Sequence, residues 1–169
     1  MKIIVSEIPE EGIDLELDEH LRTESVKILS PVHASLRIDK VGSEVLVKGT
    51  VDADIELQCS RCLKSFTMHI QSPLNVVYDP AEMISREENY KLASDELDTG
   101  FYRQDELDTD ELLLEQLLLN IPMKPLCDPE CKGICPRCGT DLNVSGCTCE
   151  TKEIDPRLKV LEQLLKKKE

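Results

Sequence analysis

The chain has 169 residues, of which 40% are hydrophobic, and a formal net charge of −14. This length suits one compact domain that buries about two-thirds of the surface exposed by its unfolded chain. No apolar run reaches the roughly 20 residues of a membrane-spanning helix. The acidic charge excludes extensive wrapping of RNA, because phosphates would be repelled, and it favours a basic partner.

The N-terminal sequence MKIIVSEIPEEGIDLELDEH lacks the long apolar segment of a secretory signal, since only Ile3, Ile4 and Val5 precede the acidic residues. We therefore expect a cytoplasmic protein whose thiols stay reduced.

The first half of the chain has the period of β-strands. Apolar and polar residues alternate along 32–38 and 45–57, with a turn at 40–43 between them. Residues 66–70 alternate beyond the pair Cys59-Ser-Arg-Cys62, which predicts an antiparallel meander with this pair at a hairpin tip. Shorter strands are predicted at 3–8 and 13–17, and an edge strand at 74–78 after Pro73.

A buried helix is predicted after an acidic loop. Residues 80–107 show no sustained period, and residues 81–115 hold twelve acids and three bases. The helix begins at Asp108, where Asp108 and Glu111 resemble a capping box, and it ends before Pro122. Leucines cover most of its circumference, which predicts packing against the sheet.

These elements predict an α+β fold with two parts. Residues 1–121 form the antiparallel sheet and the buried apolar helix, with the acidic loop at about 80–107. Residues 122–169 form a Cys-rich zinc lobe and a short C-terminal helix that starts at Asp155-Pro156, docked on the same domain.

Cysteine is concentrated in Pro125–Cys149, which holds six of the eight in the chain. In a reducing compartment such short spacings indicate zinc ligands rather than disulfides. Cys59 and Cys62 lie between two strands rather than where a strand enters a helix, which argues against a catalytic redox pair. Four thiolates close a tetrahedron around zinc with no open position, so the sites are expected to be structural.

Two groupings satisfy the spacings. In the first, one zinc binds Cys135, Cys138, Cys147 and Cys149, with Asp141, Asn143, Ser145 and Gly146 as turn residues. A second zinc then binds Cys59, Cys62, Cys127 and Cys131. In the alternative, Cys127, Cys131, Cys135 and Cys138 share one zinc, and the hairpin pair joins Cys147 and Cys149.

No enzyme is predicted. The chain has no Gly-rich phosphate loop, GxSxG elbow or HExxH motif. His33 and His69 fall on the polar faces of predicted strands, as surface residues do.

The order of the motifs CSRCLKSF, EQLLLNIPMKPLC, CKGICPRCGTDLN, CTC and DPRLKVLEQL resembles the bacterial and plastid large ribosomal RNA subunit accumulation protein (YceD-like) family, long described as a domain of unknown function. The resemblance implies a role in the synthesis, processing or stability of large-subunit ribosomal RNA, hence in ribosome biogenesis.

The expected partner is a pre-ribosomal large-subunit particle, a ribosomal protein or an rRNA-processing factor, with no membrane or small-molecule substrate. We expect Arg61, Lys132 and Arg137 to make the contact, because they are basic residues beside the cysteines of an acidic protein. Two further hypotheses stay open: an adaptor whose acidic segment 81–115 shields a basic ribosomal protein, and a thiol redox or metal-sensing switch. Direct RNA contact and oligomeric state are left undecided.

Overall fold

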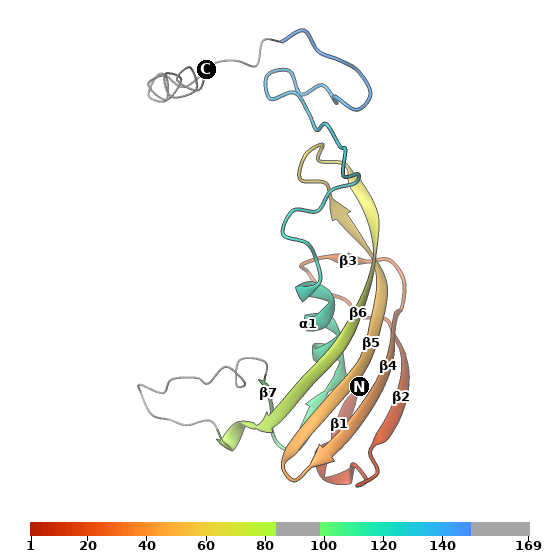
Figure 1. Ribbon diagram of the computed structural model, residues 1–169, viewed down its shortest axis with the longest axis vertical. Coiled ribbons are helices and arrows are strands. Elements are labelled where there is room, and N and C mark those ends of the chain that lie inside the picture. The colour runs from red at the N-terminus through yellow and green to blue at the C-terminus, as the bar shows by residue number, and fades with distance from the viewer. Residues whose placement is uncertain (84–98, 150–169) are drawn as a thin grey trace, which may run out of the picture. The chain divides into compact units, whose positions relative to one another are not determined.

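The computed structural model describes residues 1–83 and 99–149 (Figure 1). The chain forms two compact units: the first is Met1–Gln58 with Ser65–Pro125, and the second is Cys59–Lys64 with the chain from Leu126 onward. The C-terminal helix predicted from Asp155 lies outside the described residues.

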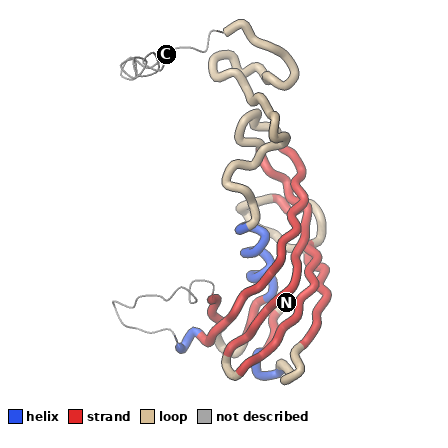
Figure 2. Tube along the Cα trace, in the orientation of Figure 1, coloured by secondary structure: helices blue, strands red, loops and turns tan. Residues whose placement is uncertain are grey.

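The first unit is built on a mostly antiparallel sheet of six strands (Figures 1 and 2). Its main path runs in the order β2 (Ile13–Glu19), β4 (Val32–Val41), β5 (Glu44–Gln58), β6 (Ser65–Pro80) and β7 (Thr99–Tyr102). The short β3 (Lys27–Ile28) pairs with β5, and among the strands of the described residues only the β6–β7 pairing is parallel.

Alternation of side chains explains the two central strands. In β4, Val32, Ala34, Leu36 and Ile38 are at most 3% exposed, whereas the residues between them face outward. In β5 the same holds for Val45, Val47, Val51, Ala53 and Ile55. The strands predicted at 32–38 and 45–57 are therefore confirmed, and their apolar faces form the core of this unit.

The strand β6 corrects the prediction of a separate edge strand at 74–78. It runs through Pro73 without interruption, and from Val77 onward it lies between β5 and β7. Pro73 pairs with Thr50 of β5, and its other side has no neighbouring strand within the described residues. Only one side of Pro73 therefore needs ladder hydrogen bonds, so proline is tolerated there.

The predicted loop at 80–107 needs a second correction. Its described part contains a 3₁₀ turn at Ala81–Met83, the strand β7 and the start of β8 (Glu106–Asp108). The strand β8 pairs with β1 (Lys2–Ile4), which is shorter than the predicted strand at 3–8 because the chain turns into a 3₁₀ helix at Val5–Glu7. These strands are stabilised by partner strands far away in the sequence. Because each is only three or four residues long, it shows no alternation of apolar and polar residues from which it could be predicted.

The helix α1 (Thr109–Leu119) begins where its sequence predicted. The Asp108 side chain accepts hydrogen bonds from the backbone N–H groups of Asp110 and Glu111, which caps the first turn. Leu112, Leu113 and Leu117 are at most 1% exposed and belong to the same core as the strands, and α1 contacts β5 and β6. In the part of the chain that the structure describes, no helix has the length and apolar character to span a membrane.

Candidate metal centres

The second unit contains the same tight turn twice. In the first turn, Cys59 N–H donates to the Lys64 carbonyl at 2.9 Å and Leu63 N–H donates to the Cys59 carbonyl at 2.9 Å. In the second turn, Cys135 N–H donates to the Thr140 carbonyl at 2.8 Å and Gly139 N–H donates to the Cys135 carbonyl at 2.9 Å. Each turn directs the two thiols of a Cys-x-x-Cys pair to one point.

The residue after each pair takes a left-handed backbone conformation. Leu63 has φ of 60° and Gly139 has φ of 72°. Glycine adopts this conformation without strain, whereas a side chain disfavours it. At Leu63 the hydrogen bonds of the turn therefore hold the backbone in a left-handed conformation that a leucine side chain disfavours.

The eight cysteines form two groups of four. The first, here called the tip group, is Cys59, Cys62, Cys127 and Cys131. The second, here called the loop group, is Cys135, Cys138, Cys147 and Cys149. In each group all four sulfur atoms lie within 4.8 Å of one another. The structure thus forms the first of the two groupings that the sequence allowed.

Sulfur distances in the tip group fit a metal ion rather than disulfides. The Cys59 and Cys131 Sγ atoms are 3.9 Å apart, and those of Cys62 and Cys127 are 3.6 Å apart. A disulfide needs about 2.0 Å, whereas thiolates about 2.3 Å from a tetrahedral metal lie about 3.8 Å from one another. All eight cysteines fall within the described residues, and each is a free thiol.

Electrostatics divide each group into thiols that ionise easily and thiols that resist ionisation. The pKa of Cys59 is lowered to about 6, first because the sulfur accepts a backbone hydrogen bond from Cys127 and then one from Cys62. The pKa of Cys127 is raised to about 12, first by its hydrogen bond with the Cys62 thiol and then by partial desolvation of the sulfur.

The loop group repeats this division. A hydrogen bond with the Thr140 hydroxyl first lowers the pKa of Cys138, to about 6, and the hydrogen bond with Cys138 first raises that of Cys149, to about 12. Four neighbouring thiols cannot all ionise without a cation among them, and a bound metal ion supplies that charge.

The two groups differ in exposure. In the tip group, Cys59, Cys62 and Cys131 are at most 5% exposed and only Cys127 is exposed. In the loop group, Cys135 is 1% exposed, Cys138 is exposed, and the other two are half-buried. Solvent and competing ligands therefore reach the loop group more easily.

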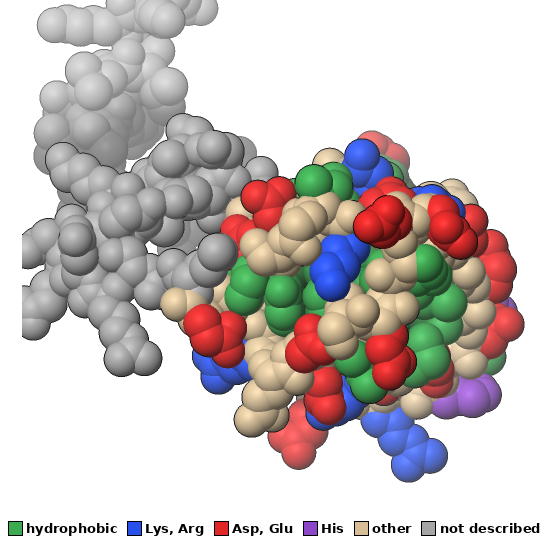
Figure 3. Space-filling view, turned by 90° about the horizontal axis from the view of Figure 1, so that it is seen from below, with side chains coloured by type: hydrophobic (Ala, Val, Ile, Leu, Met, Phe, Trp, Pro, Cys, Tyr) green, Lys and Arg blue, Asp and Glu red, His purple; other side chains and the backbone are tan. Residues whose placement is uncertain are grey.

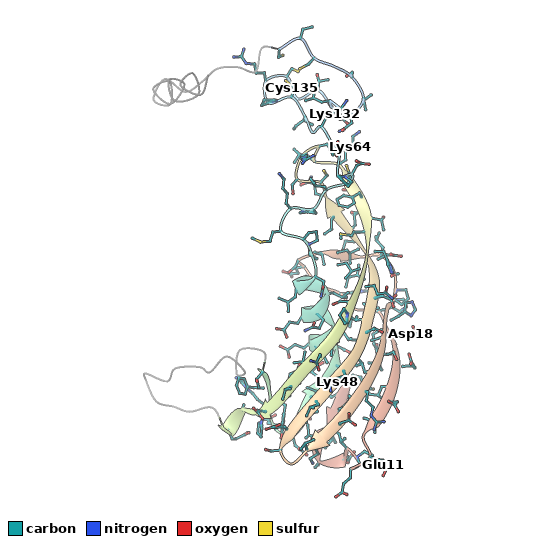
Figure 4. All side chains as sticks on the ribbon, in the orientation of Figure 1. Glu11, Asp18, Lys48, Lys64, Lys132 and Cys135 are labelled. Atoms are coloured by element: carbon teal, nitrogen blue, oxygen red, sulfur yellow. The ribbon has the colours of Figure 1, made fainter. Side chains whose placement is uncertain are left out.

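The residues predicted to contact a partner all lie in this unit and are exposed. The Arg61 guanidinium donates through Nη1 to the carbonyls of Pro129 at 3.1 Å and Cys131 at 2.7 Å, so it holds the two ligand-bearing segments together. Lys132 follows Cys131, and Arg137 lies between Cys135 and Cys138. Figure 4 labels Lys132 and Cys135 on the Cys-rich segment and Lys64 at the hairpin tip.

Sequence reasoning missed the supporting role of two residues that it treated as turn formers. Asp141 pairs with the Lys64 ammonium at 2.5 Å, and this contact first, followed by hydrogen bonds from Asn143, lowers the Asp141 pKa to about 2. The Asn143 amide donates to Cys131 Sγ at 3.4 Å. The sequence signal that could have indicated this role is the Asp-x-Asn segment, which lies between the two cysteine pairs of the loop group.

Comparison with known proteins assigns the family. Residues 47–165 match the family model described as Large ribosomal RNA subunit accumulation protein YceD. The chain belongs to the YceD family. No solved structure matches this YceD-family chain.

Several relatives support the same assignment. The uncharacterized protein YlbN of Bacillus subtilis is 31% identical over 90% of this chain and 85% of its own length. The uncharacterized protein ML1660 of Mycobacterium leprae is 30% identical over 68% of this chain, which spans about half (51%) of that relative. A chloroplastic maize protein, named Large ribosomal RNA subunit accumulation protein YCED homolog 1, is 36% identical over 29% of this chain and 17% of its own length.

Proposed function

We propose that this YceD-family chain is a non-enzymatic factor in the synthesis, processing or stability of large-subunit ribosomal RNA, with structural zinc in both four-cysteine groups. In this proposal the helix packed on an antiparallel meander forms the body, and the zinc-bound unit contacts a pre-ribosomal particle or a processing factor. The observation that carries the proposal is the family match over residues 47–165, which includes the hairpin pair and the whole Cys-rich segment.

Zinc is proposed because of the ligand set and the burial of the second unit. Four thiolates are soft ligands that leave zinc no open position, which is typical of structural rather than catalytic sites. Among the described residues of this unit, the buried side chains are cysteines: Cys59, Cys62, Cys131 and Cys135. Since no apolar cluster replaces them there, metal binding would supply the folding free energy of the unit.

Two measurements test this proposal. Elemental analysis of the purified full chain should find two equivalents of zinc. In sucrose gradients of lysate, the tagged chain should co-sediment with precursor large-subunit particles, and its depletion should lower the level of mature large-subunit RNA. Unchanged RNA levels after depletion would contradict the proposed role.

Charge reversal tests the proposed contact residues. Lys132→Glu with Arg137→Glu should release the chain from the particle fractions, whereas Lys48→Glu, at an exposed position of β5, should not. Arg61 is left unchanged because its guanidinium holds the Pro129 and Cys131 carbonyls, so its replacement would also disturb the tip group. Retention of the double variant in the particle fractions would remove these residues from the interface.

One observation favours a second candidate, the adaptor for a basic protein. The first unit has a cavity of about 610 Å³ lined by residues of β7, β8 and α1, among them Phe101, Glu111 and Glu115. The two glutamates lie four residues apart on α1, and neither carboxylate has an ion-pair partner within the described residues. The lining also includes Lys2 and Arg103, but four acidic residues outnumber them: Glu106, Asp108, Glu111 and Glu115. Aromatic side chains beside an acidic excess suit lysine or arginine side chains. Acidic side chains are also spread over the face of this unit shown in Figure 3.

Binding of a labelled lysine- and arginine-rich peptide tests the adaptor. Affinity should fall steeply with salt and should fall in Glu111→Gln with Glu115→Gln. The matched control is Glu10→Gln with Glu11→Gln, two exposed acids that do not line this cavity. Equal affinity of the two double variants would dismiss the cavity as the binding site.

A further inference from the structure

The segment 139–146 connects the two ligand pairs of the loop group, because Cys138 precedes it and Cys147 follows it. A metal ion bound by both pairs would therefore fix both ends of this segment. Without that ion the segment would lose the attachment at both ends and keep only its hydrogen bonds and the ion pair of Asp141 with Lys64, so its conformation would depend on the occupancy of the loop group.

The same segment also reaches the tip group. The Leu142 N–H donates to the Gly133 carbonyl at 2.9 Å, and the Lys132 N–H donates to Asn143 Oδ1 at 2.7 Å. Gly133 and Lys132 directly follow the ligand Cys131. Through these contacts the position of the segment determines the backbone around a tip-group ligand.

The Asn143 side chain makes the direct contact with a ligand sulfur. Its Nδ2 donates to Cys131 Sγ at 3.4 Å and to Asp141 Oδ1 at 2.8 Å. The Lys132 N–H requires an acceptor at Oδ1, so the amide is oriented with its NH₂ group toward the sulfur and the carboxylate. Asp141 is itself held by the ion pair with Lys64. The contacts with Lys132 and Asp141 thus fix the orientation of the Asn143 amide, and with it the hydrogen bond to the Cys131 sulfur.

We propose that the two four-cysteine groups are coupled through Asn143, so that a metal ion in the loop group tightens metal binding in the tip group. A hydrogen bond to a ligand sulfur stabilises the thiolate, and outer-shell partners of this kind typically change metal affinity about 10- to 100-fold. Because coupling between two sites is reciprocal, occupancy of the tip group tightens the loop group by the same factor. This inference rests on the proposed occupancy of both groups by zinc.

The test uses the full chain loaded with zinc and measures transfer of the tip-group zinc, the slower phase, into a pool of isotopically labelled free zinc, which keeps the loop group of the wild type occupied. Asn143→Ala should accelerate this transfer about 10- to 100-fold. Cys147→Ser with Cys149→Ser, which removes the loop group, should accelerate it to a similar extent. Combining all three substitutions should add little, because both changes remove the same hydrogen bond.

Controls separate the contact from general damage. Asn120→Ala replaces another exposed asparagine, whose amide donates to the Gln116 carbonyl in α1, and should leave zinc transfer unchanged. Asn143→Asp keeps the acceptor for the Lys132 N–H but loses the donor to sulfur, so it should accelerate transfer even where Asn143→Ala folds poorly. Circular dichroism of the sheet verifies folding in each variant.

Two outcomes would overturn the coupling. The first is an unchanged rate of tip-group transfer after loss of the loop group, and the second is multiplication of the two accelerations in the combined variant. Zinc content keeps this failure distinct from that of the proposed function. A wild-type chain with two zinc ions that leave independently contradicts the coupling alone. A chain that holds no zinc contradicts the proposed zinc sites, and the coupling with them.

Discussion

Replacement of Gly139 by alanine isolates the effect of backbone conformation on the loop group. Gly139 directly follows the ligand Cys138 and has φ of 72°. An added Cβ would meet no atom within 4 Å, so the substitution introduces strain without a steric clash. The left-handed conformation costs an L-residue about 1–2 kcal/mol.

This strain should appear as weaker zinc binding, because metal binding and folding of the second unit are coupled in our proposal. At about 1.4 kcal/mol per tenfold change, the expected loss of affinity is about 5- to 30-fold. Gly146→Ala is the matched control, since its Cβ would also meet open space and its φ lies outside the left-handed region. It should bind zinc as tightly as the wild type or slightly more tightly.

Gly133→Ala extends the series to a larger effect. Gly133 has φ of 78°, and its added Cβ would lie 2.9 Å from the Arg61 carbonyl oxygen, so a clash adds to the strain. Competition titrations against a chromogenic chelator should rank the losses as Gly133→Ala, then Gly139→Ala, then Gly146→Ala. If Gly139→Ala binds zinc as tightly as Gly146→Ala, the strain argument is refuted.

Three further predictions concern metal release and the first unit. Excess chelator should remove the loop-group zinc first, because only one loop-group cysteine is buried whereas three tip-group cysteines are at most 5% exposed; equal rates would contradict this order. Burial, then Glu115 and Glu111, raises the pKa of Tyr78 to about 12. The neutral Tyr78 phenol therefore contributes fully to the free energy of unfolding below about pH 10, and this contribution is lost as pH rises through about 12. Tyr78→Phe, which cannot ionise, should flatten the pH dependence of the free energy of urea unfolding over that range. Leu113→Ala, at a position that is 0% exposed, should cost about 2–5 kcal/mol in urea unfolding. Leu119→Ala, at 69% exposed, should stay within about 0.5 kcal/mol of the wild type.

Local patterns were sufficient for several elements. The alternation along 32–38 and 45–57 marks β4 and β5, because residues two apart share one face of a strand. Asp108 marks the start of α1, because a carboxylate there satisfies free N–H groups of the first turn. Each Cys-x-x-Cys pair likewise predicts its own ligand turn, since the two thiols are close in sequence.

Elements that depend on distant partners gave no such signal. The strand β7 pairs with the end of β6, and β8 pairs with β1 more than a hundred residues earlier. Both are only three or four residues long, and they lie in a segment whose charges predicted a loop. Arg61 was expected to be a contact residue, but only the fold shows its guanidinium on the Pro129 and Cys131 carbonyls.

The sequence alone determined that this protein has a sheet, a capped helix and eight thiols in short-spaced pairs, because these features depend on residues close together in the chain. Tertiary structure decided how the pairs combine, since spacing permitted two groupings and only folding brings Cys59 and Cys62 to Cys127 and Cys131. It also decided the place of Asn143, which sequence showed as a turn residue and folding brings to the Cys131 sulfur. Contacts between segments far apart in the chain form only when the backbone closes on itself, and no local pattern encodes them.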